Sequence, residues 1–542
     1  MKFKQRLLVL FTIVILFFAF LMLKEEKIDN YQKSTGNLSN VYESLQKDYK
    51  VGDESPSTND LTFDFSYLLE EGHLNTLNLS DLTMGFSSFG SVRKIIDSAQ
   101  SMGIEVLETI PELASLRFRV VDLPKAMESF AHMEEGFELS QNYKIRLPSL
   151  PEPKLVFAEK GFGDDAMNWL GVPRERSTWG KDIKVAILDS GVDAEHPLLE
   201  KALIERVQLV NQEEVVFKGH GTAIASIIGG RSTDFAGIAP STSLLSIEVL
   251  DQFGEGSSFT VAKGIIEAVT RGAKVINLSL GGEIHSTVLQ QAVTHAIENG
   301  SILVAAVGNQ GRAQVTYPAS YEGVVGVGSV DRLGRSSSFS NSGKEVDLAA
   351  PGVMVKAAWE KDEMVSFSGT SASTAFVSGA MAALLSEYPN LEENQIIDLV
   401  YDYSNEAEKP GFDPWTGHGI LNIGRIIMRN QESFADAAIV GYYFDPKDLG
   451  GAGTTPFLVT IQNQGNRWLN NMRLSVDYNG MNRNYLFNNL SPGETRSERL
   501  YLNDLNRGQP IEIISTLSLD GGDDQNLRNN IRESIITLPA LD

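Results

Sequence analysis

The stretch Val185-Ala186-Ile187-Leu188-Asp189-Ser190-Gly191 decides the fold. An unbroken apolar run is typical of a strand that is buried on both faces, and the polar residues that follow mark its end. Helical patterns separate this run from others of the same kind, at residues 244–250, 275–280, 302–307 and 324–327. Strands that alternate with helices predict an α/β fold with a parallel, doubly wound sheet.

Three polar residues stand at positions where an α/β sheet usually has its functional side chains. Asp189 ends the first strand, on the carboxyl edge where such sheets bind ligands. His220 lies between two glycines at the start of an apolar helix pattern, and Ser371 opens another predicted helix. A serine hydroxyl becomes an effective nucleophile when a base takes its proton and a carboxylate orients that base. We therefore predict that Asp189, His220 and Ser371 are catalytic.

Asn309 is a candidate for stabilising charge during the reaction, because it follows another buried strand. Its side-chain N–H and the backbone N–H of Ser371 are expected to form an oxyanion hole. The start of a helix supplies free N–H groups and the positive end of a dipole. No clustered histidine and carboxylate spacing predicts a catalytic metal, so no metal or other cofactor is expected for catalysis.

The chain also carries, in order, a series of motifs that resemble those of the subtilase family. They are VAILDSGV at 185–192, GHGT at 219–222, GIAP at 237–240, NLSLGG at 277–282, Gly308-Asn309, Tyr317-Pro318-Ala319, Ala350-Pro351-Gly352 and GTS at 369–371. The resemblance implies a subtilisin-like peptidase domain over residues 156–430, which hydrolyses peptide bonds through an acyl-enzyme on Ser371. It also implies a cleft that binds extended peptides by backbone pairing. The residues implied for that cleft are Ser279, Leu280, Gly281, Gly254, Glu255, Gly256 and Gly308.

Three positions depart from the family pattern. Ala223 stands where many relatives have a second histidine, and Ala372 to Phe376 replaces the usual sequence after the serine. We expect altered packing there, without loss of the catalytic residues. The segment 231–236 resembles a shortened calcium-binding loop. A structural calcium ion is compatible with the family, but its site is not assignable from the sequence.

The chain before the peptidase domain divides into four predicted segments. Basic residues precede an apolar run over residues 7–23, which predicts a signal anchor or signal peptide within residues 1–27. No small-x-small cleavage site follows the run, so an uncleaved anchor that reaches the membrane through residues 7–23 is favoured. The chain beyond it should be extracytoplasmic, either tethered to the cell surface or secreted. The remaining segments are a polar tether at 28–60, an α+β unit at 61–147 and a Pro-rich linker at 148–155.

The α+β unit resembles the inhibitory propeptide of the family. Its pattern predicts strand, helix, strand, strand, helix and strand, with Gly103 ending the first helix and Pro124 opening the second. The segment 138–146 resembles the propeptide tail that occupies the active-site cleft. The resemblance implies a zymogen that cuts itself within residues 142–160, with its own propeptide as an intramolecular partner.

Residues 434–542 have a different character from the peptidase domain. Short alternating runs, such as 458–461 and 472–476, are separated by Gly, Asn and Pro. This pattern predicts an antiparallel β-sandwich, and the segment resembles a CARDB-type adhesion module.

The composition limits the remaining functions. The net charge of −24 disfavours nucleic acid as a partner, because an acidic surface repels phosphate. The chain contains no cysteine, which excludes disulfides and a cysteine nucleophile. Proteins or peptides remain the expected substrates, and Glu255 could favour basic residues upstream of the cleaved bond. The alternative is a catalytically inactive subtilase that serves as a surface binding scaffold.

Overall fold

The computed structural model of the protein describes most of the chain after residue 78. The described ranges are 79–133, 136–151, 161–210, 219–232, 235–409, 411–430, 433–444, 454–478, 480–503, 510–521 and 524–537. They fall into two compact units that divide between Gln141 and Asn142. Within these ranges no helix is long and apolar enough to span a bilayer. The predicted anchor at 1–27 and tether at 28–60 lie outside the described residues.

The first unit is an antiparallel sheet with two helices, and the predicted element order is confirmed. The sheet has the strand order β2-β3-β1-β4, which is the split βαβ arrangement. Gly103 adopts φ of +72° after the first helix, and the Asp122 side chain accepts a bond from Lys125 N at the start of the second. The elements are β1 (Leu82–Phe86), α4 (Phe89–Ser98), β2 (Ile104–Ile110), η2 (Pro111–Leu113), β3 (Ser115–Val120), α5 (Leu123–Ala131) and β4 (Phe137–Gln141).

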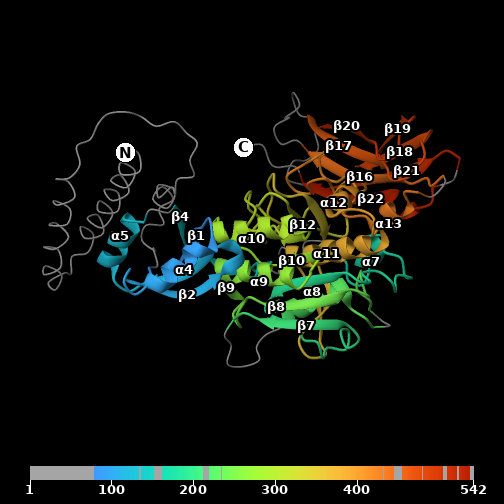
Figure 1. Cartoon of the computed structure of the whole chain (residues 1–542). Coiled ribbons are helices and arrows are strands. Elements are labelled where there is room, and N and C mark those ends of the chain that lie inside the picture. Colours follow the sequence, from blue (N-terminus) through green and yellow to red (C-terminus); the bar gives the residue numbers. More distant parts are fainter. Residues whose placement is uncertain are drawn as a thin grey trace. The chain divides into compact units, whose positions relative to one another are not determined.

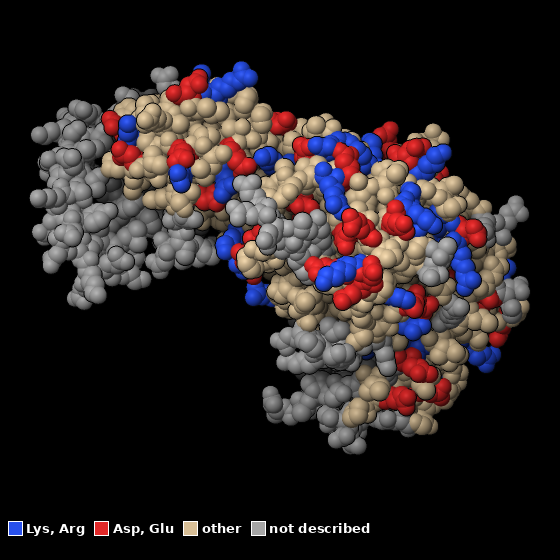
Figure 2. All heavy atoms as spheres, turned by 90° about the horizontal axis from the view of Figure 1, so that it is seen from below, with Lys and Arg blue, Asp and Glu red and all other residues tan. Residues whose placement is uncertain are grey.

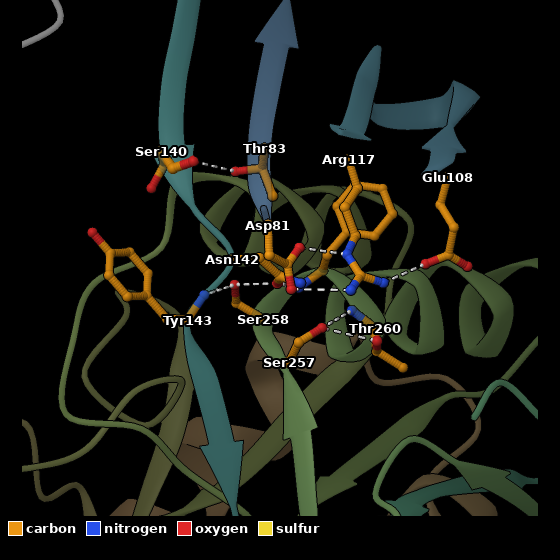
Figure 3. Close-up of polar contacts among 11 residues, drawn as sticks. Asp81, Thr83, Glu108, Arg117, Ser140, Asn142, Tyr143, Ser257, Ser258 and Thr260 are labelled. Atoms are coloured by element: carbon orange, nitrogen blue, oxygen red, sulfur yellow. Dashed lines mark hydrogen bonds and ion pairs between the residues drawn. The ribbon is translucent and has the colours of Figure 1, made fainter. Parts of the chain in front are cut away.

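An ion-pair cluster holds the strands of this unit together. Figure 3 shows Arg117 between Asp81 and Glu108, with both guanidinium ends engaged. The distances are 2.6 Å from Nε to Asp81 Oδ1 and 3.2 Å from Nη1 to Glu108 Oε2. The bidentate geometry fixes β3 against β2 and against the residue that precedes β1.

The second unit is built on a seven-stranded parallel sheet, so the predicted doubly wound fold is confirmed (Figure 1). Every pair of neighbouring strands in it is parallel, and the order is β13-β12-β11-β10-β6-β8-β7. The strands are β6 (Lys184–Asp189), β7 (Leu203–Gln208), β8 (Ser243–Glu248), β10 (Val275–Leu278), β11 (Ile302–Ala306), β12 (Val324–Val330) and β13 (Leu348–Pro351). After β6 the chain forms β7 at one edge of the sheet and then β8 between them, and it next builds outward on the other side from β10 to β13. This order leaves a topological switch point between β6 and β10.

Helices cover both faces of this sheet. Ile187 packs in a cluster with residues of α8 (Gly219–Gly229) and α11 (Thr370–Glu387). Leu188 faces the opposite way, toward Gly264 of α9 (Ser258–Thr270), and α10 (Thr287–Glu298) packs beside α9. Every residue of α8 is buried, which explains why its sequence consists mainly of glycine and small or aliphatic residues. The smaller elements are α7 (Ala166–Trp169), β9 (Glu255–Ser257), β14 (Val355–Ala358), β15 (Met364–Phe367), α12 (Glu393–Asp402) and α13 (Ile423–Met428).

The C-terminal part consists of two antiparallel sheets, in agreement with the alternating pattern. One sheet has the order β16-β17-β20 and the other β19-β18-β21-β22. Val459 and Ile461 of the first pack against Leu474, Val476 and Ile513 of the second. The strands are β16 (Ala437–Phe444), β17 (Thr454–Asn463), β18 (Met472–Tyr478), β19 (Met481–Phe487), β20 (Thr495–Asn503), β21 (Pro510–Leu519) and β22 (Ile531–Thr537), with η3 (Leu527–Asn529) before the last.

A buried arginine joins these two sheets to the fold built on the parallel sheet. Arg425 of α13 donates to the carbonyl oxygens of Tyr403 and Ser404 and, at 3.2 Å, to that of Gln464. Burial lowers the pKa of Arg425 to about 10. A buried guanidinium with three carbonyl partners makes this junction costly to separate.

The negative net charge is not gathered into one patch on the visible surface. Figure 2 shows one face of the protein, where acidic and basic side chains are interspersed.

Candidate active site

The predicted catalytic residues lie at one edge of the parallel sheet. Asp189 is the last residue of β6, and Asn309 follows β11. The strand between them is β10, which leads into Ser279. Because the carboxyl ends of parallel strands meet at the same edge of the sheet, these residues lie at one edge, on either side of the switch point.

Asp189 and His220 are joined directly. The distance from His220 Nδ1 to Asp189 Oδ2 is 2.8 Å, and both side chains are buried. The other carboxylate oxygen accepts from the backbone N–H and the hydroxyl of Ser190, at 2.7 and 3.1 Å. The ring of Phe367 meets the imidazole edge-on, with centroids 5.4 Å apart. The bond to the carboxylate favours a proton on Nδ1, which leaves Nε2 as the acceptor.

Glycines allow the helix that carries His220 to approach the end of β6. A Cβ atom at Gly221 would lie 2.2 Å from the carbonyl oxygen of Gly191. A Cβ atom at Gly219 would lie 2.5 Å from the Trp359 ring. The glycines on both sides of His220 therefore follow from close packing, of Gly221 against the Gly191 backbone and of Gly219 against the Trp359 ring.

Ser371 is the second residue of α11, so its backbone N–H is in the helix's first turn and has no acceptor within the helix. The preceding residue, Thr370, donates to Asn309 Oδ1 from its backbone N–H at 2.9 Å and from its hydroxyl at 2.8 Å. Both bonds fix the amide so that its Nδ2 group is directed away from Thr370. The structure thus links Asn309 to the start of the helix that carries Ser371.

A buried polar network connects β10 with the same helix. Asn277 Nδ2 donates to Ser279 Oγ at 2.9 Å, and Ser279 Oγ donates to the Ser371 carbonyl at 3.3 Å. Ser378 Oγ, two turns along α11, donates to Asn277 Oδ1 at 2.9 Å. Thr370, Asn277 and Ser378 were not predicted from the sequence. For Asn277 the available signal was a polar residue within an otherwise apolar buried strand.

A segment of the chain occupies the cleft that the resemblance implied. Strand β5 (Lys144–Arg146) pairs with β9 in antiparallel fashion, with Ile145 opposite Gly256. On its other side, Arg146 exchanges two backbone bonds with Gly281, at 3.0 and 2.8 Å. Leu147 N donates to the Gly254 carbonyl at 3.0 Å. Gly254, Glu255, Gly256 and Gly281 therefore flank residues 144–147 as pairing strands.

The start of this segment is fixed at the N-terminus of α9, as Figure 3 shows. Tyr143 N donates to Ser258 Oγ at 3.1 Å, and Ser258 Oγ donates to Asn142 Oδ1 at 3.2 Å. Phe259 N also donates to that amide oxygen, at 3.0 Å. Residues 142–147, which we had assigned to the α+β unit, thus pack on the second unit, because their backbone groups find partners there.

The end of the segment reaches the predicted oxyanion hole. Asn309 Nδ2 donates to the carbonyl oxygen of Ser149 at 3.0 Å. The next residue, Leu150, is exposed. The peptide bond between Ser149 and Leu150 is therefore the bond whose carbonyl is aligned with this donor.

Two other predicted cleft residues have supporting positions. The Leu280 side chain is fully buried beside Gly281. Gly308 adopts φ of +108°, and a Cβ atom there would lie 2.4 Å from Asn341 Nδ2. Gly308 thus permits the turn that presents Asn309.

No group of three or more His, Cys, Asp or Glu residues in the described part of the chain could hold a metal ion. The shortened loop predicted near Arg231 closes through a bridge between Arg231 and Ala236, and part of it lies outside the described residues. Structural calcium therefore stays a prediction.

The fold and the residues at the carboxyl edge of its parallel sheet define a hydrolase of the serine nucleophile class. Comparison with known proteins then identifies the family within that class. The family model described as "Subtilase family" matches residues 180–446. Thermostable alkaline protease from Halalkalibacterium halodurans is 38% identical over 254 residues, which are 46% of this chain and 69% of that protein. Thermitase from Thermoactinomyces vulgaris is 41% identical over 38% of this chain and 76% of its own. Subtilisin DY from Bacillus licheniformis is 36% identical over 45% of this chain and 90% of its own.

The chain therefore belongs to the subtilase family and is a subtilisin-like serine endopeptidase. Peptidases of this family need no cofactor for catalysis. The fold likeness extends beyond the peptidase domain. The crystal structure of fervidolysin from Fervidobacterium pennivorans, a keratinolytic enzyme related to subtilisin, covers 85% of this chain and 93% of its own. Its TM-score is 0.56 at 19% sequence identity.

Proposed function

We propose that the protein is an exported endopeptidase whose acyl-enzyme forms on Ser371. His220 Nε2 takes the proton of the Ser371 hydroxyl as Oγ attacks the substrate carbonyl carbon. Asp189 orients the imidazole and stabilises its charged form. Asn309 Nδ2 and the Ser371 N–H donate to the oxyanion, and His220 then gives its proton to the leaving amine. Water releases the acyl group by the same steps in reverse order.

We also propose that the protein is made as a zymogen that cuts itself between Ser149 and Leu150. The observation that carries both proposals is the bond from Asn309 Nδ2 to the Ser149 carbonyl, at 3.0 Å. Strand pairing of residues 144–147 on both sides supports the view that the segment is bound as a substrate. The α+β unit would act as the inhibitory propeptide, with 142–149 as its tail.

The test compares wild type with Ser371→Ala, because alanine removes the nucleophile and little volume. Wild-type protein should lose its N-terminal part and begin at Leu150 on N-terminal sequencing, whereas the variant should stay uncut. Adding matured wild type to the variant should then generate the same new N-terminus. If both proteins begin at the same residue without added enzyme, another protease performs the maturation.

A fluorophosphonate probe tests the catalytic assignment separately from processing. The matured enzyme should be labelled on Ser371, and His220→Ala should abolish labelling because the hydroxyl then has no base. Failure to label folded, matured wild type would instead support the inactive scaffold.

Export and surface attachment are part of the proposal. The apolar run 7–23 with basic residues before it supports translocation of the rest of the chain. The two C-terminal antiparallel sheets support a CARDB-like accessory domain. Fractionation of cells that produce Ser371→Ala should recover the chain with the membrane, accessible to protease added outside. Recovery in the cytoplasm would contradict export.

A further inference from the structure

The segment in the cleft makes two ionic contacts with one acidic residue. Lys144 Nζ lies 3.2 Å from Glu255 Oε2, and Arg146 Nη2 lies 2.8 Å from Glu255 Oε1. Lys144 and Arg146 are separated by one residue, so their side chains project from the same face of β5. Each oxygen of the carboxylate therefore holds a different cation.

The opposite face of the segment is apolar. Ile145 lies between the two basic residues and is fully buried. Gly282 borders this side chain, because a Cβ atom at Gly282 would lie 2.8 Å from Ile145 Cδ1. The cleft thus buries an aliphatic side chain, and the basic side chains of the residues before and after it project from the opposite face toward Glu255.

Glu255 keeps its place through contacts of its own backbone. Its N–H donates to Asp251 Oδ1 at 2.9 Å, and its carbonyl accepts from Asp251 N at 2.8 Å. Gly254 adopts φ of +71° within this turn, and Ser257 caps α9 directly after it. Because these bonds close the turn, they hold the backbone of Glu255 in place beside β5.

We propose that Glu255 selects peptide substrates with basic residues at the fourth and sixth positions before the cleaved bond and an aliphatic residue at the fifth. The proposal rests on the proposed function, since the positions are counted from Ser149 as the residue before the bond. Lys144, Ile145 and Arg146 then occupy the sixth, fifth and fourth positions. The enzyme would read in other proteins the pattern that its own tail presents.

The test uses matured enzyme and three quenched fluorescent peptides of sequence X-Ile-X-Leu-Pro-Ser-Leu-Pro. In the first peptide the X residues are Lys and Arg, in the second both are Gln, and in the third both are Glu. The ion pairs are partly exposed, so each should contribute modestly. We expect kcat/KM for the basic peptide to exceed that of the Gln peptide about fivefold, with the Glu peptide slowest. The preference should shrink in 1 M salt, which screens charges beyond about 3 Å.

Glu255→Lys should reverse the order of kcat/KM among the three peptides, with the Glu peptide now cut fastest and the basic peptide slowest. The matched control Glu298→Lys makes the same change of charge on the exposed surface of α10 and should keep the wild-type order. Each variant is matured by a trace of tagged wild type, which is then removed.

The outcomes separate this inference from the proposed function. Equal rates for the three peptides with wild type, or an unchanged order in Glu255→Lys, would overturn the selection by charge. If wild type cuts none of the peptides, or cuts after a residue other than Ser, the assigned bond is wrong and the counted positions fail with it.

Discussion

Replacing Asn309 by leucine should remove one donor to the oxyanion and slow the chemical step. Nδ2 lies 3.0 Å from the Ser149 carbonyl oxygen, and the side chain is buried. Losing one such donor costs about 2.7–4 kcal/mol, or 10²–10³ in kcat, a range known from a subtilisin rather than worked out for this chain. The developing negative charge exists only in the transition state and the tetrahedral intermediate. The loss should therefore appear in kcat, with KM little changed.

Thr370→Val provides a graded comparison at the same amide. Asn309 Oδ1 accepts two bonds from Thr370, at 2.9 Å from the backbone and 2.8 Å from the hydroxyl. Valine has nearly the size of threonine and keeps the backbone bond, so only the hydroxyl bond is lost. One such bond contributes about 0.5–1.5 kcal/mol. If most of that free energy holds the amide in place, kcat should fall about 2- to 13-fold.

The assay is steady-state hydrolysis of the Lys-Ile-Arg peptide by enzyme matured with tagged wild type. Active-site titration gives the concentration of competent enzyme, and thermal unfolding checks that each variant is folded. The expected order of kcat is wild type, Thr370→Val, Asn309→Leu. The reasoning fails if Asn309→Leu keeps more than a tenth of the wild-type kcat, or if the effect lies wholly in KM.

Three further predictions follow from other contacts. Asp189→Asn should lower kcat about 10⁴-fold, because an amide beside Nδ1 favours the wrong imidazole tautomer; near-normal turnover would contradict the role of the 2.8 Å bond. Gly282→Val should raise the inhibition constant of a peptide spanning residues 142–149 at least tenfold, since even a Cβ atom would lie 2.8 Å from Ile145 Cδ1; equal inhibition of wild type and variant would exclude the packing of Ile145 there. Burial raises the pKa of the Asp436 carboxyl to about 6, so its contribution to stability is complete below about pH 4 and is lost as the pH rises through 6, by up to about 3 kcal/mol. Urea unfolding of Ser371→Ala between pH 4 and 8 should show this loss of stability. When Asp436→Asn is added, the free energy of unfolding should depend less on pH.

Local pattern accounts for the elements that the sequence predicted well. An apolar run such as Val185 to Leu188 forms a strand that is buried on both faces. Such a strand can be predicted from a few neighbouring residues, without knowledge of the rest of the chain. Boundaries depend on caps that local hydrophobicity does not reveal. Helix α9 begins at Ser258, because the Ser257 side chain accepts from Thr260 N.

The residues of the candidate site also divide into those that a local sequence pattern predicts and those that it does not. Asp189, His220, Asn309 and Ser371 were predicted because each follows a buried strand or opens a helix with a residue type that the chemistry needs. Thr370 was not, although it stands inside the same motif. Its role depends on a bond to an amide 61 positions away in the chain.

The sequence by itself determined the order of strands and helices, the family and the residue types available for catalysis. These follow from hydrophobic periodicity and short motifs, which act over a few neighbouring residues. Only the tertiary structure decided that Ser149 presents its carbonyl to Asn309 and that Lys144 and Arg146 share Glu255. Both depend on the register of β5 against β9, and a slip of one residue would turn Ile145 outward and both cations inward. Such a register is set by contacts between segments more than a hundred residues apart, which no local pattern encodes.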